Sequence, residues 1–364
     1  MAVRQKELRE IVALHRQRYP LMEPADYGKL LYQNEFGPEH MVDSPEGVLE
    51  QITREWEKQV SVAAPAHTAP ESPEEIGNRL CRFHLTGGYD LSAAAPLLAR
   101  LFYLTAKQHR GSAESLKEKL AWLEQYGRRF GLCAPALESW LEEYRRAGCP
   151  ALHHSAAFRE AYAPHYRILR EEYAIYFPIL YETEKRLLAS KSVLLAIDGP
   201  CGGGKSSLAA LLAELFPCRV LHMDDYYLPP ERRSPGWERT PCGNMDLERF
   251  LQEALLPASR GETIVCRPYS CQKGQLTEAR VLPAAPLTVV EGSYSQHPLL
   301  APHYDLKIFL YCRPGEQLAR LKRREGTGLE AYRQRWIPLE EAYYRTFGIE
   351  SRCDLRFDNT PYFM

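Results

Sequence analysis

The feature that most constrains the fold is the glycine-rich segment Gly199–Ser206, which reads GPCGGGKS and follows the pattern G-x-x-x-x-G-K-[ST]. An apolar run, SVLLAID, leads into it, and an amphipathic run, SSLAALLAELF, leaves it. Strand, loop and helix in this order place backbone N–H groups around a phosphate at a helix N-terminus. We therefore predict an ATP-binding loop made by Gly199, Cys201, Gly202, Gly203, Gly204, Lys205, Ser206 and Ser207.

Each residue type in this loop has a chemical reason. The lysine Lys205 reaches the β- and γ-phosphate oxygens, and the Ser206 hydroxyl is a typical ligand of the Mg²⁺ that accompanies ATP. A chance match in a glycine-rich turn is the alternative. The strand before the loop and the helix after it argue against chance, so ATP and Mg²⁺ are the expected cofactors.

Composition narrows the class of protein. The chain has 364 residues with 46 Lys and Arg against 47 Asp and Glu, a net charge of −1. This balance disfavours a nucleic-acid partner, and no apolar run approaches the roughly 20 residues that span a bilayer. The N-terminal 20 residues mix charged and apolar side chains, unlike a secretory signal. We expect a cytoplasmic protein that binds neither nucleic acid nor membrane, and assembly into a homo-oligomer stays open.

The ten cysteines are scattered, without a C-x-x-C pair. Reduced thiols are the expectation, and neither a disulfide framework nor a zinc site is favoured.

The pattern of apolar and β-branched residues changes near residue 190, and the length of the chain suggests two domains. Residues 1–150 repeat apolar side chains at helical spacing and predict a mostly α-helical domain of unknown role. Residues 151–190 are rich in tyrosine and charge and predict a helical connector. Residues 191–364 alternate helical segments with β-branched runs, which predicts an α/β domain with a mainly parallel sheet. The expected strands are Val193–Ile197, Val220–Met223, Thr263–Cys266, Leu287–Val290 and Leu306–Tyr311.

Two expected strands end in carboxylates. Asp224 and Asp225 follow Val220–Met223, at the edge where α/β sheets bind ligands. A carboxylate there can accept the proton of an attacking hydroxyl, and we favour Asp224 for that role over the alternative of a turn cap. Glu291 ends the next such strand, and beside a phosphate loop it is predicted to hold Mg²⁺ together with Ser206.

Arg320 and Arg324 are four residues apart and therefore lie on one face of an expected helix. Such a pair can stabilise charge on a phosphoryl group in transfer. A solvated run of charge is the alternative. The N-K-x-D sequence expected for guanine recognition is absent, so a GTPase switch is disfavoured.

Taken in order, residues 191–364 resemble the uridine kinase and phosphoribulokinase group of P-loop kinases. The resemblance is carried by the phosphate loop, by the strand-end Glu291-Gly292 and by further motifs: Asp224 with Tyr226 and Tyr227, Asn244 with Asp246, Pro268-Tyr269, Arg320 with Arg324 and Glu325, and Cys353-Asp354-Leu355. It implies a P-loop kinase domain in which Asp224 is the general base and Tyr227, Asp246 and Tyr269 contact the acceptor. Arg320 and Arg324 would form a lid.

This resemblance predicts an ATP-dependent phosphotransferase that acts on an alcohol group of a small metabolite, with a uridine-like nucleoside as the first acceptor to test. The chain departs from the group on the acceptor side: Ser270 follows Pro-Tyr in place of an acid, and the lid is shortened to EGTG. The alternative function is an ATP-binding regulatory or scaffold protein without small-molecule phosphotransfer.

The first 150 residues contain one polar constellation and no family resemblance. Glu35 and His40 could bind a metal or a small anion, with Arg79, Arg82 and His84 further along the chain. Helix caps and satisfied turn residues are the alternative interpretation, and it is the one we favour.

Overall fold

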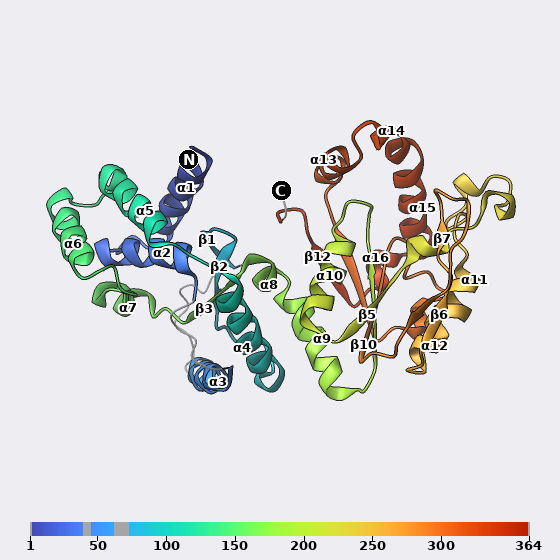
Figure 1. Cartoon of the computed structure of the whole chain (residues 1–364), viewed down its shortest axis with the longest axis horizontal. Coiled ribbons are helices and arrows are strands. Elements are labelled where there is room, and N and C mark those ends of the chain that lie inside the picture. Colours follow the sequence, from blue (N-terminus) through green and yellow to red (C-terminus); the bar gives the residue numbers. More distant parts are fainter. Residues whose placement is uncertain (1, 39–44, 62–72, 363–364) are drawn as a thin grey trace. The chain divides into compact units, whose positions relative to one another are not determined.

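The computed structural model describes residues 2–38, 45–61 and 73–362 (Figure 1). The chain divides into two compact units, Met1–Glu182 and Thr183–Met364. In the part of the chain that is described, no helix is both long and apolar enough to cross a membrane.

The first unit is built from helices around a small sheet. Three antiparallel strands, β1 (Glu74–Gly77), β2 (Leu80–His84) and β3 (Tyr166–Arg170), pair in that order. The helices are α1 (Ala2–Arg18), α2 (Pro24–Phe36), α3 (Pro45–Ser61), α4 (Leu91–Gln108), α5 (Ala113–Tyr126), η2 (Gly127–Phe130), α6 (Ala134–Arg146), α7 (Ala156–Tyr162) and α8 (Glu171–Ile175).

The segment 151–190, predicted to be a helical connector, contains strand β3. Its sequence YRILR buries its three central residues, so the Tyr-rich periodicity that suggests a helix is overridden by pairing with β2. Because β2 and β3 are more than 80 residues apart in sequence, local spacing gives no sign of this pairing.

The second unit contains a five-stranded parallel sheet in the order β12-β11-β4-β10-β5. The strands are β4 (Val193–Asp198), β5 (Cys218–His222), β10 (Leu287–Glu291), β11 (Leu306–Tyr311) and β12 (Leu355–Asp358). The α/β class with a parallel sheet, predicted for residues 191–364, is confirmed. Parallel strands need crossovers, which the intervening helices supply.

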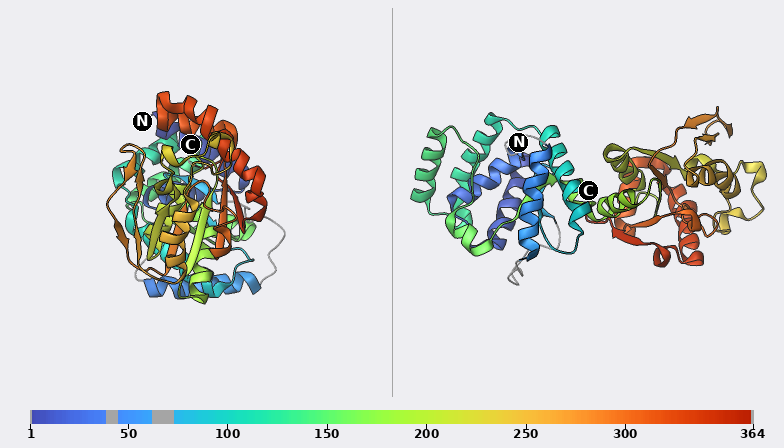
Figure 2. Two further views of the ribbon diagram at one scale, coloured as in Figure 1. Left: turned by 90° about the vertical axis from the view of Figure 1, so that its right-hand side faces the viewer. Right: turned by 90° about the horizontal axis from the view of Figure 1, so that it is seen from below.

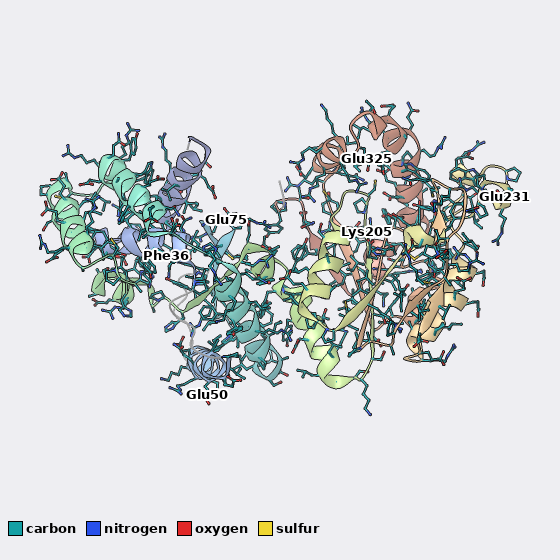
Figure 3. All side chains as sticks on the ribbon, in the orientation of Figure 1. Phe36, Glu50, Glu75, Lys205, Glu231 and Glu325 are labelled. Carbon is teal, nitrogen blue, oxygen red and sulfur yellow. The ribbon has the colours of Figure 1, made fainter. Side chains whose placement is uncertain are left out.

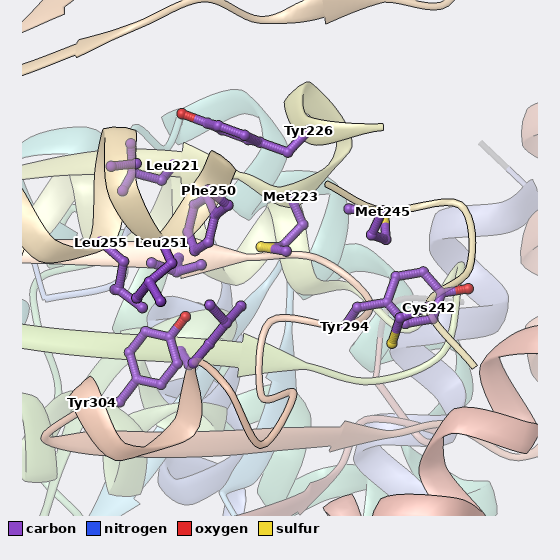
Figure 4. Packing of buried hydrophobic residues seen from close by; sticks show 14 of the residues in the cluster. Leu221, Met223, Tyr226, Cys242, Met245, Phe250, Leu251, Leu255, Tyr294 and Tyr304 are labelled. Carbon is purple, nitrogen blue, oxygen red and sulfur yellow. The ribbon is translucent and has the colours of Figure 1, made fainter. Parts of the chain in front are cut away.

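Helices cover both faces of this sheet (Figure 2). Helix α10 (Lys205–Leu215) packs on β4, β5 and β10. On the opposite face Leu194, Leu221 and Val290 join a buried cluster with Phe250 and other residues of α11 (Leu247–Phe250), the π-helix η6 (Leu251–Leu255) and α12 (Leu256–Ser259) (Figure 4). Burial on both faces explains why β4 and β10 are almost continuously apolar.

One expected strand lies outside the parallel sheet. The run Thr263–Cys266 forms β6 (Ile264–Cys266), which pairs antiparallel with β9 (Arg280–Leu282). A second short pair joins β7 (Tyr269–Ser270) to β8 (Gln275–Leu276). The other elements are α9 (Phe177–Ala189), η3 (Met223–Tyr226), η4 (Pro230–Arg232), η5 (Trp237–Arg239), η7 (Ala301–His303), α13 (Pro314–Glu325), η8 (Gly326–Gly328), α14 (Leu329–Ala331), the π-helix η9 (Tyr332–Trp336), α15 (Ile337–Phe347) and α16 (Ile349–Arg352).

Candidate active site

The phosphate loop lies between β4 and α10, at the carboxyl edge of the sheet. Gly199 has φ +142°, and a Cβ there would stand 2.3 Å from the carbonyl oxygen of Leu310. Gly204, at φ +97°, precedes the first residue of α10. Both conformations are costly for other residues, so the two outer glycines of the motif are required by the backbone.

Lys205 folds back over this loop. Its ammonium donates hydrogen bonds to the carbonyl oxygens of Gly199, at 2.7 Å, and Pro200, at 3.1 Å. The Ser293 hydroxyl lies 3.3 Å from the same nitrogen. The side chain is buried, which keeps its positive charge at the edge of the loop where phosphate oxygens are expected.

Glu291, at the end of β10, lies between the loop and β5. The Ser206 hydroxyl donates to its Oε2 at 3.1 Å, and His222 Nδ1 lies 2.6 Å from its Oε1. Burial opposes ionisation of Glu291, but the hydrogen bond from His222 and the charge of Lys205 hold its pKa below the usual range. A hydroxyl beside an ionised carboxylate is an oxygen donor set that suits Mg²⁺.

Asp224 lies in η3, directly after β5. Register brings it close to the loop, because His222 pairs with Glu291 and Glu291 pairs with Ile197 on β4. The Tyr227 hydroxyl donates to Asp224 Oδ1 at 2.9 Å, which orients a carboxylate that is otherwise exposed.

The neighbouring Asp225 differs from Asp224. It lies 3.4 Å from Arg280, and burial raises its pKa. Asp225 is absent from the lining of the cavity that Asp224 helps to form.

A cavity of about 730 Å³ unites these groups. Figure 3 shows Lys205 at the end of the sheet, below the segment that carries Glu325. The lining contains most of the predicted site residues, namely Cys201, Gly202, Gly204, Lys205, Ser206, Ser207, Asp224, Tyr227, Glu291, Arg320 and Arg324.

The two helix α13 arginines have different surroundings. Arg320 is 11% exposed, and its guanidinium binds Glu316 at 2.8 Å and the carbonyl oxygens of Asn359 and Tyr362. Arg324 is 55% exposed and contacts Glu325. Both line the cavity, but Arg320 is already held by the C-terminal segment, whereas Arg324 is open to solvent.

Two predicted acceptor contacts lie elsewhere. Asp246 caps α11 by accepting from the Arg249 N–H at 3.4 Å, and it binds Arg232 at 2.8 Å. Tyr269 is buried in the short strand β7. Neither residue is among those that line the cavity, and their contact with an acceptor stays a prediction.

Sequence reasoning missed Glu340 on α15. Its carboxylate accepts from the Cys201 N–H at 2.9 Å and from the Ser293 hydroxyl at 2.5 Å. It comes from 139 residues beyond the loop, so no local motif marks it.

Asp198, at the end of β4, was also missed. Burial raises its pKa to about 6, against hydrogen bonds from the Gln296 N–H, the Tyr343 hydroxyl and the Gly199 N–H. The signal was present, since Asp198 is the last residue of the apolar run that leads into the glycines.

The cavity has further residues that the sequence did not indicate. Arg233 and Arg335 both lie over the Trp237 ring, at 4.8 Å and 6.0 Å from its centroid. The remaining lining residues that no motif suggested include Cys271, Ser293, Tyr294, Tyr332, Trp336 and Asn359.

The described acid of the polar constellation in the first unit, Glu35, is held by contacts within the protein. Glu35 accepts from the Ser112 N–H at 2.7 Å and binds Lys119 at 2.5 Å. His40 lies outside the described residues, as does Glu39. Among the residues that are described, no group of three or more His, Cys, Asp or Glu side chains could hold a metal ion.

No protein-family model matches the chain, and no curated protein matches it in sequence. Solved structures do show similarity. A structure described as a possible uridine kinase from Bacillus stearothermophilus has 20% identity and a TM-score of 0.39, covering 48% of this chain and 94% of that one. A putative fructose transport system kinase from Silicibacter sp. TM1040 has 21% identity and a TM-score of 0.37, covering 46% and 89%.

D-glycerate 3-kinase from Cryptococcus neoformans has 14% identity and a TM-score of 0.36, covering 48% of this chain and 89% of that chain. All three are described as kinases, the first as a possible uridine kinase. Because the TM-scores are below 0.5, the fold is assigned from the strand order and phosphate loop of the chain itself.

Proposed function

We propose that this protein is an ATP- and Mg²⁺-dependent kinase that transfers the γ-phosphoryl group to a hydroxyl of a small metabolite. One observation carries the proposal: Lys205, Ser206, Glu291 and Asp224 line a single cavity. A phosphate loop alone serves many ATP-binding proteins. A carboxylate positioned beside it, and oriented by the Tyr227 hydroxyl, is what a phosphotransferase requires in addition.

ATP binds in the phosphate loop with Mg²⁺ beside it. The loop amides and Lys205 bind the β- and γ-phosphates, and Ser206 with Glu291 would hold Mg²⁺. When bound, Mg²⁺ neutralises negative charge on the phosphate oxygens. Glu340 fixes the Cys201 end of the loop through the hydrogen bond to its N–H, at 2.9 Å.

The transfer itself needs a proton acceptor. Asp224 takes the proton of the acceptor hydroxyl. The oxygen of that hydroxyl forms a bond to the γ-phosphorus, and the bond from this phosphorus to the leaving oxygen of ADP breaks. Arg324, the more exposed of the two lid arginines, approaches the transferring group from α13. Arg320 contributes charge from a fixed position, since backbone carbonyls hold it.

The acceptor site is formed by aromatic and cationic side chains of the cavity wall. A nucleoside such as uridine is the first candidate because of the sequence resemblance, and the rings of Tyr227, Tyr332 and Trp336 in the cavity wall are suited to stack on a base. Arg233 and Arg335 add positive charge to the same cavity, which also suits an acceptor that carries an anionic group.

The test is a screen of nucleosides, sugars and vitamin precursors for ATP-dependent phosphorylation, followed by Asp224→Asn. We expect the substitution to lower kcat by about 10²- to 10⁴-fold with little change in ATP affinity. Asp225→Asn is the matched control, because Asp225 lies outside the cavity lining and should leave kcat within about threefold. Near-normal turnover by Asp224→Asn would contradict the mechanism. Tight ATP binding with no acceptor phosphorylated would favour an ATP-binding regulatory protein instead.

A further inference from the structure

The first unit contains a cavity of its own, of about 410 Å³. Its lining residues come from α2, α3, α4, α7, β3 and the segments that flank α7. These elements are labelled in Figure 1. Its volume is in the range of small-molecule sites. The lining is Lys29, Gln33, Glu55, Phe102, His153, His154, Arg159, Ala163, Pro164, His165, Tyr166, Arg167 and Ile168.

The lining is strongly cationic in a chain of nearly neutral charge. Lys29, Arg159 and Arg167 share the lining with a single carboxylate, Glu55, and His153 and His165 add further nitrogen atoms. The whole chain has a net charge of −1, so this concentration of positive groups does not follow from composition. Arg167 is paired with Glu55 at 2.7 Å, which leaves Lys29 and Arg159 as the cations that no carboxylate in the lining pairs with.

One side of the cavity is a satisfied polar wall. Asp26 is ionised and binds His154 Nδ1 at 2.8 Å, so that nitrogen carries the proton. His154 Nε2 therefore accepts from the Tyr166 hydroxyl at 2.6 Å, and the Gln33 amide donates to the same hydroxyl oxygen at 3.2 Å. Burial lowers the pKa of His154 to about 4, so the imidazole stays neutral at pH 7 and the charge of this wall is that of the Asp26 carboxylate, which does not line the cavity.

The other side offers donors without partners. Among the described residues none forms a hydrogen bond with the side chains of His153, Arg159 or His165, although all three line the cavity. The Lys29 ammonium donates one hydrogen bond to the carbonyl oxygen of Leu152. Burial, with the charge of Arg82, lowers the pKa of Lys29 to about 8, a cost that a bound anion would offset.

The backbone beside these donors is strained. Ala163 has φ +39° and lies directly before Pro164, although residues before proline favour extended conformations. A left-handed alanine costs about 1–2 kcal/mol, and such strain is concentrated at ligand-binding loops. Here the strained residue lies in the turn from α7 to β3, between Arg159 and His165.

We propose that this cavity binds a small phosphate monoester, with Arg159, Lys29, His153 and His165 around the phosphate and Phe102, Pro164 and Ile168 beside the rest of the ligand. A phosphate monoester has close to two negative charges at neutral pH, which matches the two cations left without a carboxylate. The volume is too large for inorganic phosphate alone and fits a phosphorylated metabolite. This site does not depend on the proposed kinase activity.

The test uses the full chain with Lys205→Ala as background, so that the phosphate loop does not dominate phosphate binding. Ribose 5-phosphate, inorganic phosphate, ribose and succinate are titrated by calorimetry. We expect ribose 5-phosphate to bind more tightly than inorganic phosphate, and ribose and succinate to bind poorly. Arg159→Gln should weaken ribose 5-phosphate at least about tenfold, the effect of losing a charge-assisted hydrogen bond. His153→Gln should weaken it less.

Arg146→Gln is the matched control. Arg146 is an exposed arginine at the end of α6 that does not line the cavity, so affinity should stay within about twofold. Three results would overturn the proposal: no binding of ribose 5-phosphate up to about 10 mM, binding that is unaffected by Arg159→Gln, or binding of succinate in preference to both phosphates.

Discussion

The two units bury charge in opposite ways. In the first unit, buried charges neutralise one another: Glu74 is 1% exposed and is surrounded by Arg82 at 3.4 Å, His84 at 2.9 Å and His15 at 3.0 Å. Burial opposes the ionisation of Glu74, but Arg82 and the two histidines hold its pKa well below the usual range. In the second unit, Lys205 and Glu291 line an open cavity.

The difference shows what each set of charges is for. A buried ion pair closed on itself holds segments together, and removal of one partner leaves the other charge without compensation. The charges of the second unit are kept at the edge of the sheet by backbone and hydroxyl contacts, with room left for a ligand. We therefore expect loss of stability from substitutions in one unit and loss of activity in the other.

The largest effect on stability is expected from Arg82→Met. Methionine preserves volume but leaves Glu74 buried without its main counter-charge and Gln33 without its guanidinium partner, at 2.8 Å. The free energy of unfolding of the first unit should fall by about 3–5 kcal/mol in denaturant titration, with ATP affinity unchanged. Arg128→Met is the control, since that arginine is 75% exposed and its ion pair contributes about 1 kcal/mol at most. A loss from Arg82→Met no larger than that of the control would contradict a structural role for these charges.

The converse is expected of Lys205→Ala. Loss of the ammonium should lower ATP turnover by about 10²- to 10³-fold, because it removes charge stabilisation of the transferring group. Unfolding should change far less than for Arg82→Met, since only contacts within the loop are lost. Lys191→Ala, an exposed lysine just before β4, is the matched control and should leave turnover unchanged. ATP turnover near the unsubstituted level would remove Lys205 from the site.

The sequence was informative where chemistry is local. The phosphate loop, Asp224 and Glu291 each follow an apolar strand directly, so strand-end residues could be predicted to meet once the sheet was expected to be parallel. Glu340 and Arg335 were not predicted, because they line the cavity from helices near the C-terminus and no sequence motif connects these helices with the phosphate loop.

The first unit was predicted less well for the same reason. Helical periodicity is local and indicated most of its helices, but the pairing of β2 with β3 joins distant segments. Arg82 and His84 were weighed as part of a candidate site, with satisfied structural residues as the favoured interpretation, but their carboxylate partner Glu74 comes from a segment that the sequence gave no reason to connect with them. Polar residues that turn out to be buried therefore look like site residues when only the sequence is known. Their structural role becomes visible once their partners are known.

The pH dependence of stability sharpens the comparison further. The pKa of His154 is about 4 in the folded unit, below its usual value of 6.5, so between these values the unfolded chain binds more protons. Its contribution is present above about pH 6.5 and is lost as the pH falls towards 4. From pH 7 to pH 5 the free energy of unfolding of the first unit, measured by denaturant titration, should fall by about 2 kcal/mol more in the wild type than in His154→Gln. His153→Gln, at the exposed neighbouring histidine, should keep the wild-type slope. Equal slopes for wild type and His154→Gln would show that His154 is not held neutral.

The smallest effect is expected from separating the units. All residues that line the larger cavity lie between Cys201 and Asn359, and the parallel sheet begins at Val193, so residues 183–364 contain every residue that lines the proposed ATP site. Helix α9 crosses the boundary: Phe177 packs on Phe83 in the first unit, whereas Arg186 binds the carbonyl oxygen of Asp305 in the second. A fragment that starts at Thr183 keeps the second contact.

This fragment should bind ATP with Mg²⁺ within about threefold of the affinity of the full chain, as measured by calorimetry. Lys205→Ala in the fragment is the control and should remove most of that binding. If the fragment binds ATP but phosphorylates none of the acceptors that the full chain phosphorylates, the first unit is required for catalysis, and the division between a structural and a chemical unit is too simple. A folded fragment that binds no ATP would show that the charges of the second unit depend on the first for their placement.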